Sequence, residues 1–255
     1  MKSITGVLFD LDGVFYVGNQ LISGGNETLA WLRKQGIKYQ FITNNTTLSR
    51  SALTEKLKEL GLNIQEGELL SANYAGVLQL EKMGLKRCRL ILTKAAQKDY
   101  PPNVLKDPEA IVIGDIGNSW DYDLLNELMN QILRGAELIA LHKGRYFQTE
   151  AGLQLDSGAF VAALEHATGK KAKVVGKPSQ AFFEMGSSLL GSKPNELLMV
   201  GDDLVNDIQG AQDAGYQSVL VQTGKYREAL VKQSDISPDG IIPSIAELPS
   251  YLLSN

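Results

Sequence analysis

The stretch Ile4-Thr5-Gly6-Val7-Leu8-Phe9-Asp10-Leu11-Asp12-Gly13 places a short apolar run directly before two aspartates. Such runs, when rich in β-branched residues, are typical of buried strands, and Asp-x-Asp-Gly is typical of a turn. Three similar runs lie later in the chain, at residues 39–43, 197–200 and 218–221. Helical patterns that end at glycines lie between them. This alternation predicts an α/β fold with a parallel sheet, in which ligands bind at the carboxyl ends of the strands.

The middle of the chain interrupts this order. Residues 84–171 contain their own strand-like runs and their own helical patterns, at residues 122–133 and 158–168. A self-sufficient α/β unit in the middle of a chain is typical of an inserted domain. We therefore expect a core domain formed by residues 1–83 and 172–255, and an inserted domain at residues 84–171.

Composition narrows the classes of function. The formal net charge of the 255 residues is −4 at pH 7, and the basic residues are scattered, which argues against a nucleic-acid partner. A single cysteine, Cys88, cannot form an internal disulfide, so a reducing compartment is expected. No segment is long enough to span a bilayer, and the first apolar run is too short for a signal peptide. We expect a cytoplasmic protein without a membrane partner.

Carboxylates follow two of the predicted strands. Asp10 and Asp12 follow the first strand, and Asp202 follows the run at residues 197–200. Brought to one sheet edge, these groups would repel one another unless a cation lay between them. Oxygen ligands suit Mg²⁺, and a chain with two histidines and one cysteine offers no zinc-type cluster. The sequence therefore predicts a magnesium site.

Hydrogen-bond donors and a positive charge accompany these acids. Thr43 and Asn44 end the second strand, and Lys177 precedes a helical pattern. Such groups suit the oxygens of a phosphoryl group, because phosphoryl transfer depends mostly on positioning and charge stabilisation. A carboxylate can accept the phosphoryl group, and a second carboxylate two residues away can move the protons.

The motifs, taken together and in this order, resemble those of the haloacid dehalogenase-like (HAD) hydrolase superfamily: Asp10-x-Asp12-Gly13, Thr43-Asn44-Asn45, Lys177 and Gly201-Asp202-x-x-x-x-Asp207. The position of the inserted unit, after the second motif and before the lysine, is similar to that in the C2-capped, NagD-like class IIA branch. The resemblance implies a Rossmann-like HAD core with a parallel sheet and an inserted α/β cap domain of the C2 type.

The resemblance also implies a role for each motif. Asp10 would be the nucleophile and a metal ligand, and Asp12 the general acid/base, with its backbone carbonyl on Mg²⁺. Lys177 would bridge the phosphate and Asp10, and Asp202 would be a metal ligand. Thr43 and Asn44 would hold the phosphate. The resemblance also implies two residues that would not contact the substrate. Asp207 would orient Lys177 or the water ligands of the metal, and Asp203 would support the site.

A large cap is expected to roof the site and to set specificity. Three of its residues are candidates for substrate contacts: His142, Asp156 and Ser157. A structural alternative for Asp156 or Ser157 is capping of the following helix.

We therefore expect Mg²⁺-dependent hydrolysis of small phosphate monoesters, with pyrophosphate and phospho-amino acids among the candidate substrates, through a phospho-aspartate on Asp10. The partners expected are a small phosphorylated metabolite and, as in C2-capped relatives, a second copy bound through the cap. Two alternatives remain open. One is a catalytically silent binding protein with this fold, and the other is a different activity of the superfamily, such as a phosphonatase or phosphomutase.

Overall fold

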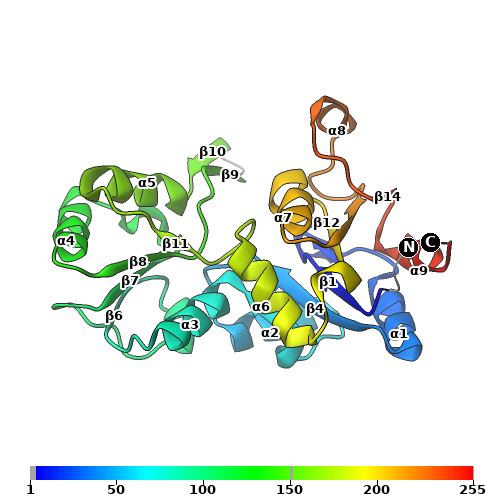
Figure 1. Cartoon of the computed structure of the whole chain (residues 1–255), viewed down its shortest axis with the longest axis horizontal. Coiled ribbons are helices and arrows are strands. Elements are labelled where there is room, and N and C mark those ends of the chain that lie inside the picture. Colours follow the sequence, from blue (N-terminus) through cyan, green and yellow to red (C-terminus); the bar gives the residue numbers. More distant parts are fainter. Residues whose placement is uncertain (1–3, 150–151, 255) are drawn as a thin grey trace. The chain divides into compact units, whose positions relative to one another are not determined.

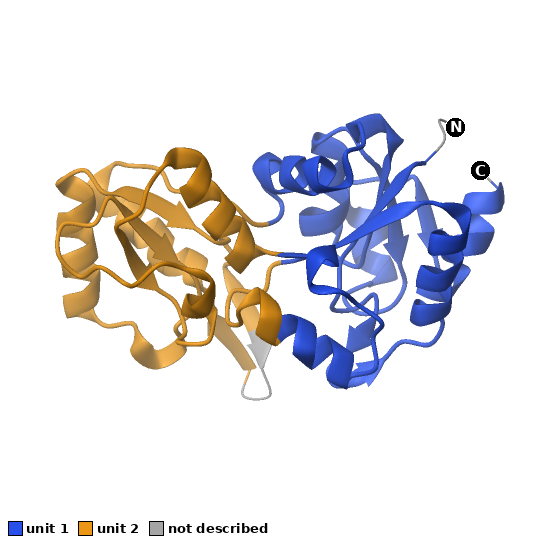
Figure 2. Ribbon diagram, turned by 90° about the horizontal axis from the view of Figure 1, so that it is seen from below, with its two compact units in different colours: residues 1–43, 53–70, 177–255 blue, residues 44–52, 71–176 orange. Residues whose placement is uncertain are grey.

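The computed structural model of the chain describes residues 4–149 and 152–254 (Figure 1). Residues 1–3, 150–151 and 255, over which the expected domains also extend, lie outside this description. The chain divides into two compact units (Figure 2). Unit 1 consists of residues 1–43, 53–70 and 177–255, and unit 2 of residues 44–52 and 71–176.

Unit 1 contains a six-stranded sheet of order β14-β13-β12-β1-β4-β5. The pairings of β1 with β4 and β12, of β12 with β13, and of β13 with β14 are all parallel, which confirms the predicted type of sheet. The strands are β1 (Gly6–Phe9), β4 (Lys38–Thr43), β5 (Leu69–Ser71), β12 (Leu197–Gly201), β13 (Gln217–Val221) and β14 (Gly240–Ile242). A small hairpin pairs β2 (Tyr16–Val17) with β3 (Gln20–Leu21).

Helices lie between these strands in the chain, as the alternating pattern predicts: α1 (Gly25–Gln35), α2 (Arg50–Glu59), α6 (Gln180–Leu190), α7 (Gly210–Asp213) and α8 (Glu228–Gln233). A last helix, α9 (Leu248–Ser254), follows β14. The segment before α7 is a π-helical turn, Leu204–Gln209, which α7 continues. The reason is local, because the amide of Ile208 donates to the carbonyl of Asp203, five residues earlier.

Aromatic packing fixes the strand that carries the first motif. The ring of Phe9 lies edge-on to Phe15, with centroids 5.2 Å apart, and Phe15 lies edge-on to Phe41 at 5.1 Å. All three side chains are fully buried, and each contributes about 1.5–3 kcal/mol by leaving water. Because Phe9 directly precedes Asp10, this packing also fixes the position of the Asp10 backbone.

Unit 2 has its own sheet of four parallel strands, of order β11-β8-β7-β6. The strands are β6 (Cys88–Ile91), β7 (Ala110–Ile113), β8 (Glu137–Ala140) and β11 (Lys173–Val174). Helices α4 (Tyr122–Leu133) and α5 (Ser157–Thr168) pack with this sheet around a shared apolar core. Cys88 is fully buried, and Trp120 stacks on Phe160 with centroids 4.3 Å apart. Both side chains therefore serve packing.

The longer segment of unit 2 starts at residue 71, and residues 44–52 also belong to this unit, whereas the sequence places the start of the inserted domain at residue 84. Helix α3 (Ala72–Met83) belongs to unit 2 because Asn73 is bonded to the segment after β6. The Asn73 amide donates to Asp99 at 2.9 Å, and the Tyr100 hydroxyl donates to the Asn73 carbonyl at 2.6 Å. The far boundary lies at residue 176 rather than 171, because β11 pairs with β8.

The segment at residues 152–158 is largely regular. Its first part is a strand, β10 (Gly152–Leu155), which pairs antiparallel with β9 (Tyr146–Thr149).

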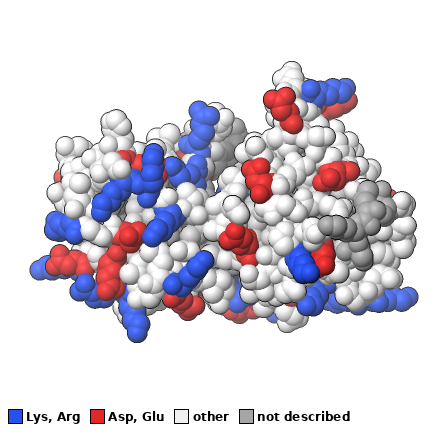
Figure 3. All heavy atoms as spheres, viewed as in Figure 1, with Lys and Arg blue, Asp and Glu red and all other residues white. Residues whose placement is uncertain are grey.

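Acidic and basic side chains are interspersed on the face drawn in Figure 3, without a basic stripe. Within residues 4–149 and 152–254, every helix is too short or too polar to cross a bilayer.

Candidate active site

The sheet of unit 1 brings three of the predicted motifs to one edge. Asp10 follows β1, Thr43 ends β4, and Asp202 follows β12, and these three strands are neighbours in the order β12-β1-β4. The Asp10 amide donates to the Val200 carbonyl at 2.9 Å, which continues the β1–β12 ladder past the end of the strand. Asp10, Thr43 and Asp202 are all buried. The carboxyl-edge rule therefore places them together, as expected.

Lys177 is clamped between two carboxylates. Its Nζ lies 2.7 Å from Asp10 Oδ1 and 2.7 Å from Asp207 Oδ1, and its side chain is only 3% exposed. Burial alone would lower the pKa of the lysine, but the attraction of Asp10 and Asp207 outweighs it and holds the pKa above its ordinary value. The ammonium therefore stays charged and its position is fixed.

Asp207 is completely buried and uses both of its oxygens within the protein. Oδ1 receives Lys177, while Oδ2 receives the amides of Asp202 at 3.2 Å and Asp203 at 3.1 Å. Gly201 leaves the necessary room, since a Cβ there would lie 2.4 Å from Asp207 Oδ2. Asp207 thus positions Lys177 and the turn that carries Asp202. Of the two roles that the family resemblance implied for it, this geometry matches the one directed at Lys177.

Asp202 carries the clearest sign of an absent partner. Its Oδ2 accepts the Lys225 amide at 2.7 Å, but its buried Oδ1 has no hydrogen-bond partner among the residues described. Oxygens of Asp10, Asp202 and Asp207 lie within 4.8 Å of one another. Burial and the Asp10 charge raise the pKa of Asp202 to about 7. A divalent cation would bind the orphaned oxygen and offset the repulsion, so these residues fit a metal.

Asp10 and Asp202 are the two carboxylates of this cluster that a metal would contact, because Asp207 is already fully engaged.

Two glycines make room for the Asp202 carboxylate. A Cβ at Gly13 would lie 2.0 Å from Asp202 Oδ2, and one at Gly224 would lie 2.1 Å from it. Both glycines have positive φ, +81° and +62°, where a side chain would be strained. The Thr223 hydroxyl donates to the Gly13 carbonyl and ties the two loops together.

Sequence reasoning gave no role to the loop Thr223–Lys225. The loop follows β13, whose carboxyl end lies at the same sheet edge. The rule that predicted the other motifs could therefore have found this loop as well.

Asp12 is exposed, unlike Asp10. Partial desolvation and the charge of Asp10 raise its pKa, against the opposing effect of Lys225 and Lys56. A raised pKa favours a carboxyl group that can donate a proton. The Asp12 side chain lies outside the three-carboxylate cluster, and the predicted contact of its backbone carbonyl with a metal stays a prediction.

Asp203 supports the loop. Its Oδ1 accepts the amides of Val205 and Asn206 at 3.1 and 2.9 Å, and its Oδ2 accepts Lys225 Nζ at 2.9 Å and Asn206 Nδ2 at 3.0 Å. Burial raises the pKa of Asp203, but Lys225 and the hydrogen bonds from Asn206 outweigh it and lower the pKa to about 2. Asp203 therefore caps the π-helical turn as a charged group.

The Thr43-Asn44-Asn45 motif spans the division between the units, because Asn44 is the first residue of unit 2. Within unit 2, a Cβ at Gly176 would lie 2.7 Å from Asn44 Oδ1, so this glycine gives the amide its space. Asn45 Oδ1 accepts the amides of Thr47 and Leu48 at 3.2 and 3.1 Å. Asn45 thus stabilises the turn that leads toward α2.

The candidate specificity residues lie together in unit 2. His142 Nε2 lies 3.5 Å from Asp156 Oδ1 and 3.4 Å from Ser157 Oγ, and its Nδ1 accepts the Gly144 amide at 3.0 Å. Burial lowers the pKa of His142, against the opposing charges of Asp156 and Asp115. Asp156 is the N-cap of α5, which is the structural alternative for this residue. Contact of these residues with substrate stays a prediction.

Comparison with known proteins gives a consistent family. A family model described as haloacid dehalogenase-like hydrolase matches residues 7–100, and a HAD-hydrolase-like model matches residues 174–248. The phospholysine phosphohistidine inorganic pyrophosphate phosphatase of Xenopus laevis is 36% identical over 261 residues, covering this whole chain and 96% of that protein. The haloacid dehalogenase-like hydrolase domain-containing protein 2 of Bos taurus is 39% identical, covering 89% of this chain and 88% of that one.

Solved structures agree in fold. The 4-nitrophenylphosphatase of Thermotoga maritima matches with a TM-score of 0.89 at 26% identity, covering 97% of each chain. NagD of E. coli matches with a TM-score of 0.85 at 23% identity, covering 96% of this chain and 98% of that one, and shows the fold alone. The family models and the extent of these matches show that the chain belongs to the haloacid dehalogenase-like hydrolase superfamily.

Proposed function

We propose that this protein is a Mg²⁺-dependent phosphatase that hydrolyses small phosphate monoesters through a phospho-aspartate on Asp10. One observation carries the proposal. Asp10 is buried, and its Oδ1 lies 2.7 Å from Lys177 Nζ. In the same cluster, Asp202 has a buried carboxylate oxygen without a hydrogen-bond partner among the residues described. Lone carboxylates are poor nucleophiles toward a phosphate dianion, because the charges repel. Lys177 and a cation held by Asp10 and Asp202 would remove that repulsion.

The proposed reaction has two steps. An Asp10 oxygen forms a bond to phosphorus as the bond to the leaving oxygen breaks, and Asp12 gives that oxygen its proton. The Asp12 carboxylate then takes a proton from water, whose oxygen attacks phosphorus and releases inorganic phosphate and free Asp10. The raised pKa of Asp12 supports this role, because the acid form persists to higher pH.

The remaining groups would bind rather than react. Lys177 would hold one phosphate oxygen and Asp10 together, with its charge kept by Asp207. Thr43 and Asn44 would donate hydrogen bonds to the other oxygens. The bound Mg²⁺ would supply the positive charge that the transferring phosphoryl group requires. The names of the relatives, an inorganic pyrophosphate phosphatase and a 4-nitrophenylphosphatase, support a substrate of small size.

Phosphate release from a panel of small phosphate esters, pyrophosphate and phospho-amino acids tests this proposal. The wild type should release phosphate only with Mg²⁺, and Asp10→Asn should lower the rate by roughly 10³-fold or more. Asp213→Asn is the matched control, because this exposed aspartate of α7 lies outside the cluster, and its activity should stay unchanged. Metal binding without turnover on the whole panel would instead favour a catalytically silent binding protein.

A further inference from the structure

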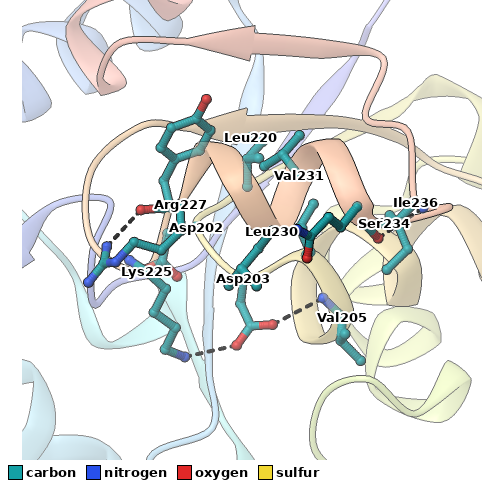
Figure 4. A pocket seen from close by; sticks show the side chains of 13 residues that line it. Asp202, Asp203, Val205, Leu220, Lys225, Arg227, Leu230, Val231, Ser234 and Ile236 are labelled. Atoms are coloured by element: carbon teal, nitrogen blue, oxygen red, sulfur yellow. Dashed lines mark hydrogen bonds and ion pairs between the residues drawn. The ribbon is translucent and has the colours of Figure 1, made fainter.

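The loop Thr223-Gly224-Lys225 follows β13 and has no part in the proposed transfer of the phosphoryl group. It nevertheless contacts a predicted metal ligand, because the Lys225 amide donates to Asp202 Oδ2 at 2.7 Å. Both residues line one pocket of unit 1, where they lie close together (Figure 4). The other oxygen of Asp202, Oδ1, is buried and has no hydrogen-bond partner among the residues described. The loop therefore holds one oxygen of this carboxylate and leaves the other for a cation.

The oxygen that the loop holds lies between two stretches of backbone. A Cβ at Gly13 or at Gly224 would lie 2.0 or 2.1 Å from Asp202 Oδ2. A Cβ at Gly224 would also lie 2.6 Å from the Cα of Gly13, so the two backbones pass each other without room for a side chain. The orientation of the Asp202 carboxylate therefore depends on how closely the loop approaches the turn at Gly13.

The Thr223 hydroxyl fixes this approach. It donates to the carbonyl of Gly13, which lies 210 positions away in the chain. The backbone directly before Thr223 is held by the sheet, because the Gln222 amide donates to the Ile242 carbonyl at 3.0 Å and continues the pairing of β13 with β14. The hydroxyl thus links the edge of the sheet to the turn of the first motif.

Other contacts of the loop fix its shape rather than this link. The Arg227 side chain donates to the carbonyls of Gly224 at 3.1 Å and Tyr226 at 2.6 Å. The Lys225 ammonium lies 2.9 Å from Asp203 Oδ2, which ties the loop to the segment after β12. Tyr226 and Arg227 border a pocket of about 430 Å³, so this part of the chain has open space on one side. These contacts do not reach the turn of the first motif.

We propose that Thr223 is a positioning residue for the metal. Its hydroxyl docks the loop on the Gly13 turn, so that the Lys225 amide holds Asp202 Oδ2 while Asp202 Oδ1 remains available to the cation. Groups that hydrogen-bond to a metal ligand fix its orientation, and their loss commonly weakens metal binding by roughly 10–100-fold. This inference rests on the proposed metal-dependent function and adds to it a residue that acts through Asp202.

Titration of the Tm with Mg²⁺, without substrate and at constant ionic strength, tests the inference. An ion that binds the folded protein raises its stability by an amount that depends on the ratio of the ion concentration to Kd, so the titration gives Kd. We expect Thr223→Val, which removes the hydroxyl and keeps the size of the side chain, to raise the Kd for Mg²⁺ about tenfold. Thr223→Ser keeps the hydroxyl, and its Kd should stay within about threefold of the wild-type value.

Thr28→Val is the matched control. The Thr28 hydroxyl also donates to a distant carbonyl, that of Ile245 at 3.0 Å. Both residues are buried, and Thr28 lies in α1, outside the carboxylate cluster. This substitution should lower the Tm without metal, because a buried carbonyl loses its donor. The Kd for Mg²⁺ should stay unchanged, which separates a loss of stability from a loss of metal affinity.

A Kd for Thr223→Val within about threefold of the wild-type value would overturn the inference. An equal increase in Thr223→Ser or in Thr28→Val would overturn it as well, because the hydroxyl or its place in the fold would then be irrelevant. If Thr223→Val does not fold, Thr223→Ala takes its place, since it leaves room for a water beside the Gly13 carbonyl.

The same titration distinguishes this inference from the proposed function. A wild type whose Tm does not respond to Mg²⁺ would contradict both. A wild type that binds Mg²⁺ in a way that depends on Thr223, but releases no phosphate from any ester of the panel, would contradict the proposed function alone.

Discussion

Two polar clusters, one in each unit, contain a lysine and a carboxylate at the same distance and differ in burial and in how their charges are balanced. In unit 1, Lys177 lies 2.7 Å from Asp10 and also from Asp207. In unit 2, Lys143 Nζ lies 2.7 Å from Glu165 Oε2. The distance between the charged atoms is therefore no guide to which cluster performs chemistry.

The two clusters differ in the exposure of the lysine and in the groups that surround it. Lys143 is 35% exposed, and its partner Glu165 also accepts the Ala172 amide at 2.9 Å. Burial raises the pKa of Glu165, but Lys143 and that hydrogen bond outweigh it and hold the pKa below its ordinary value. In unit 1, three carboxylates gather around a lysine that is 3% exposed, and the pKa of Asp202 rises to about 7. In unit 2, Lys143 and Lys171, at 2.7 and 3.9 Å from Glu165 Oε2, offset the charge of this one carboxylate, whereas negative charge is in excess in unit 1.

This excess is the property that indicates function. A fold gains no stability by burying carboxylates that repel one another, and replacing them with apolar groups would cost little. Their presence is explained by a ligand that supplies the missing positive charge, and buried titratable groups with perturbed pKa values mark such sites. The balanced cluster of unit 2 requires no ligand. Three predictions test this difference, beginning with the largest effect.

Removing the buried lysine should have the largest effect. Lys177→Met leaves Asp10 and Asp207 without their cation, so we expect the free energy of unfolding to fall by about 3–5 kcal/mol at neutral pH. The destabilisation should shrink toward pH 4, because the carboxylates that lost their partner then take up protons in the folded state. Activity should fall at least as far as in Asp10→Asn. Chemical denaturation at several pH values measures the first two effects.

The control for this variant comes from the other cluster. Lys143→Met removes an ammonium at the same distance from a carboxylate, but in a partly exposed pair, and should cost about 1 kcal/mol or less. The double variant Lys177→Met/Asp207→Asn should regain part of the lost stability without regaining activity. Equal destabilisation by Lys177→Met and Lys143→Met would refute the contrast between the clusters.

Metal binding should have the next largest effect, and it depends on pH. The pKa of Asp202 in the folded, metal-free protein is about 7, against an ordinary value of 3.8. The folded state therefore holds a proton that the unfolded state has lost, and this contribution to stability disappears as the pH rises from about 4 to 7. With EDTA, we expect the Tm to fall between pH 5 and pH 8. Mg²⁺ at about 100 times its Kd should reverse this, adding about 2.7 kcal/mol.

The variant Asp202→Asn distinguishes the effect of metal binding on stability from the effect of the proton on Asp202. This variant keeps the shape of the side chain and removes its charge, so without metal it should be more stable than the wild type at pH 8. It should also lose the Mg²⁺-dependent rise in Tm. A rise in Tm as large as that of the wild type would place the metal elsewhere.

Much of this arrangement follows from sequence because it depends on local rules. Helix α4 lies at the residues predicted from the helical pattern, 122–133. The edge rule for parallel sheets brings Asp10 and Asp202 together although they are far apart in the chain.

What sequence reasoning missed depends on tertiary contacts. The edge rule could have placed the loop Thr223–Lys225 near the site, but the close approach of Gly13 and Gly224 to the Asp202 carboxylate is a tertiary contact that leaves no periodic signal. The grouping of residues 72–83 with unit 2 also depends on tertiary contacts. Helix α3 belongs there through hydrogen bonds of Asn73 with residues 96–100, which amphipathic periodicity cannot reveal.

The smallest expected effect concerns Asp156, at the start of helix α5 in unit 2. The Asp156 carboxylate caps α5 by accepting the Ser157 amide at 2.7 Å, and it lies 3.5 Å from His142 Nε2. Asp156→Ala should therefore lower the free energy of unfolding by about 1 kcal/mol, as the loss of an N-cap does. The values of kcat and KM for 4-nitrophenyl phosphate should change less than about threefold. Parallel denaturation and kinetic measurements decide between the two roles considered for this residue. An increase in KM for some phosphate esters and not for others, at unchanged stability, would show that Asp156 contacts substrate, because a capping residue acts on every substrate alike.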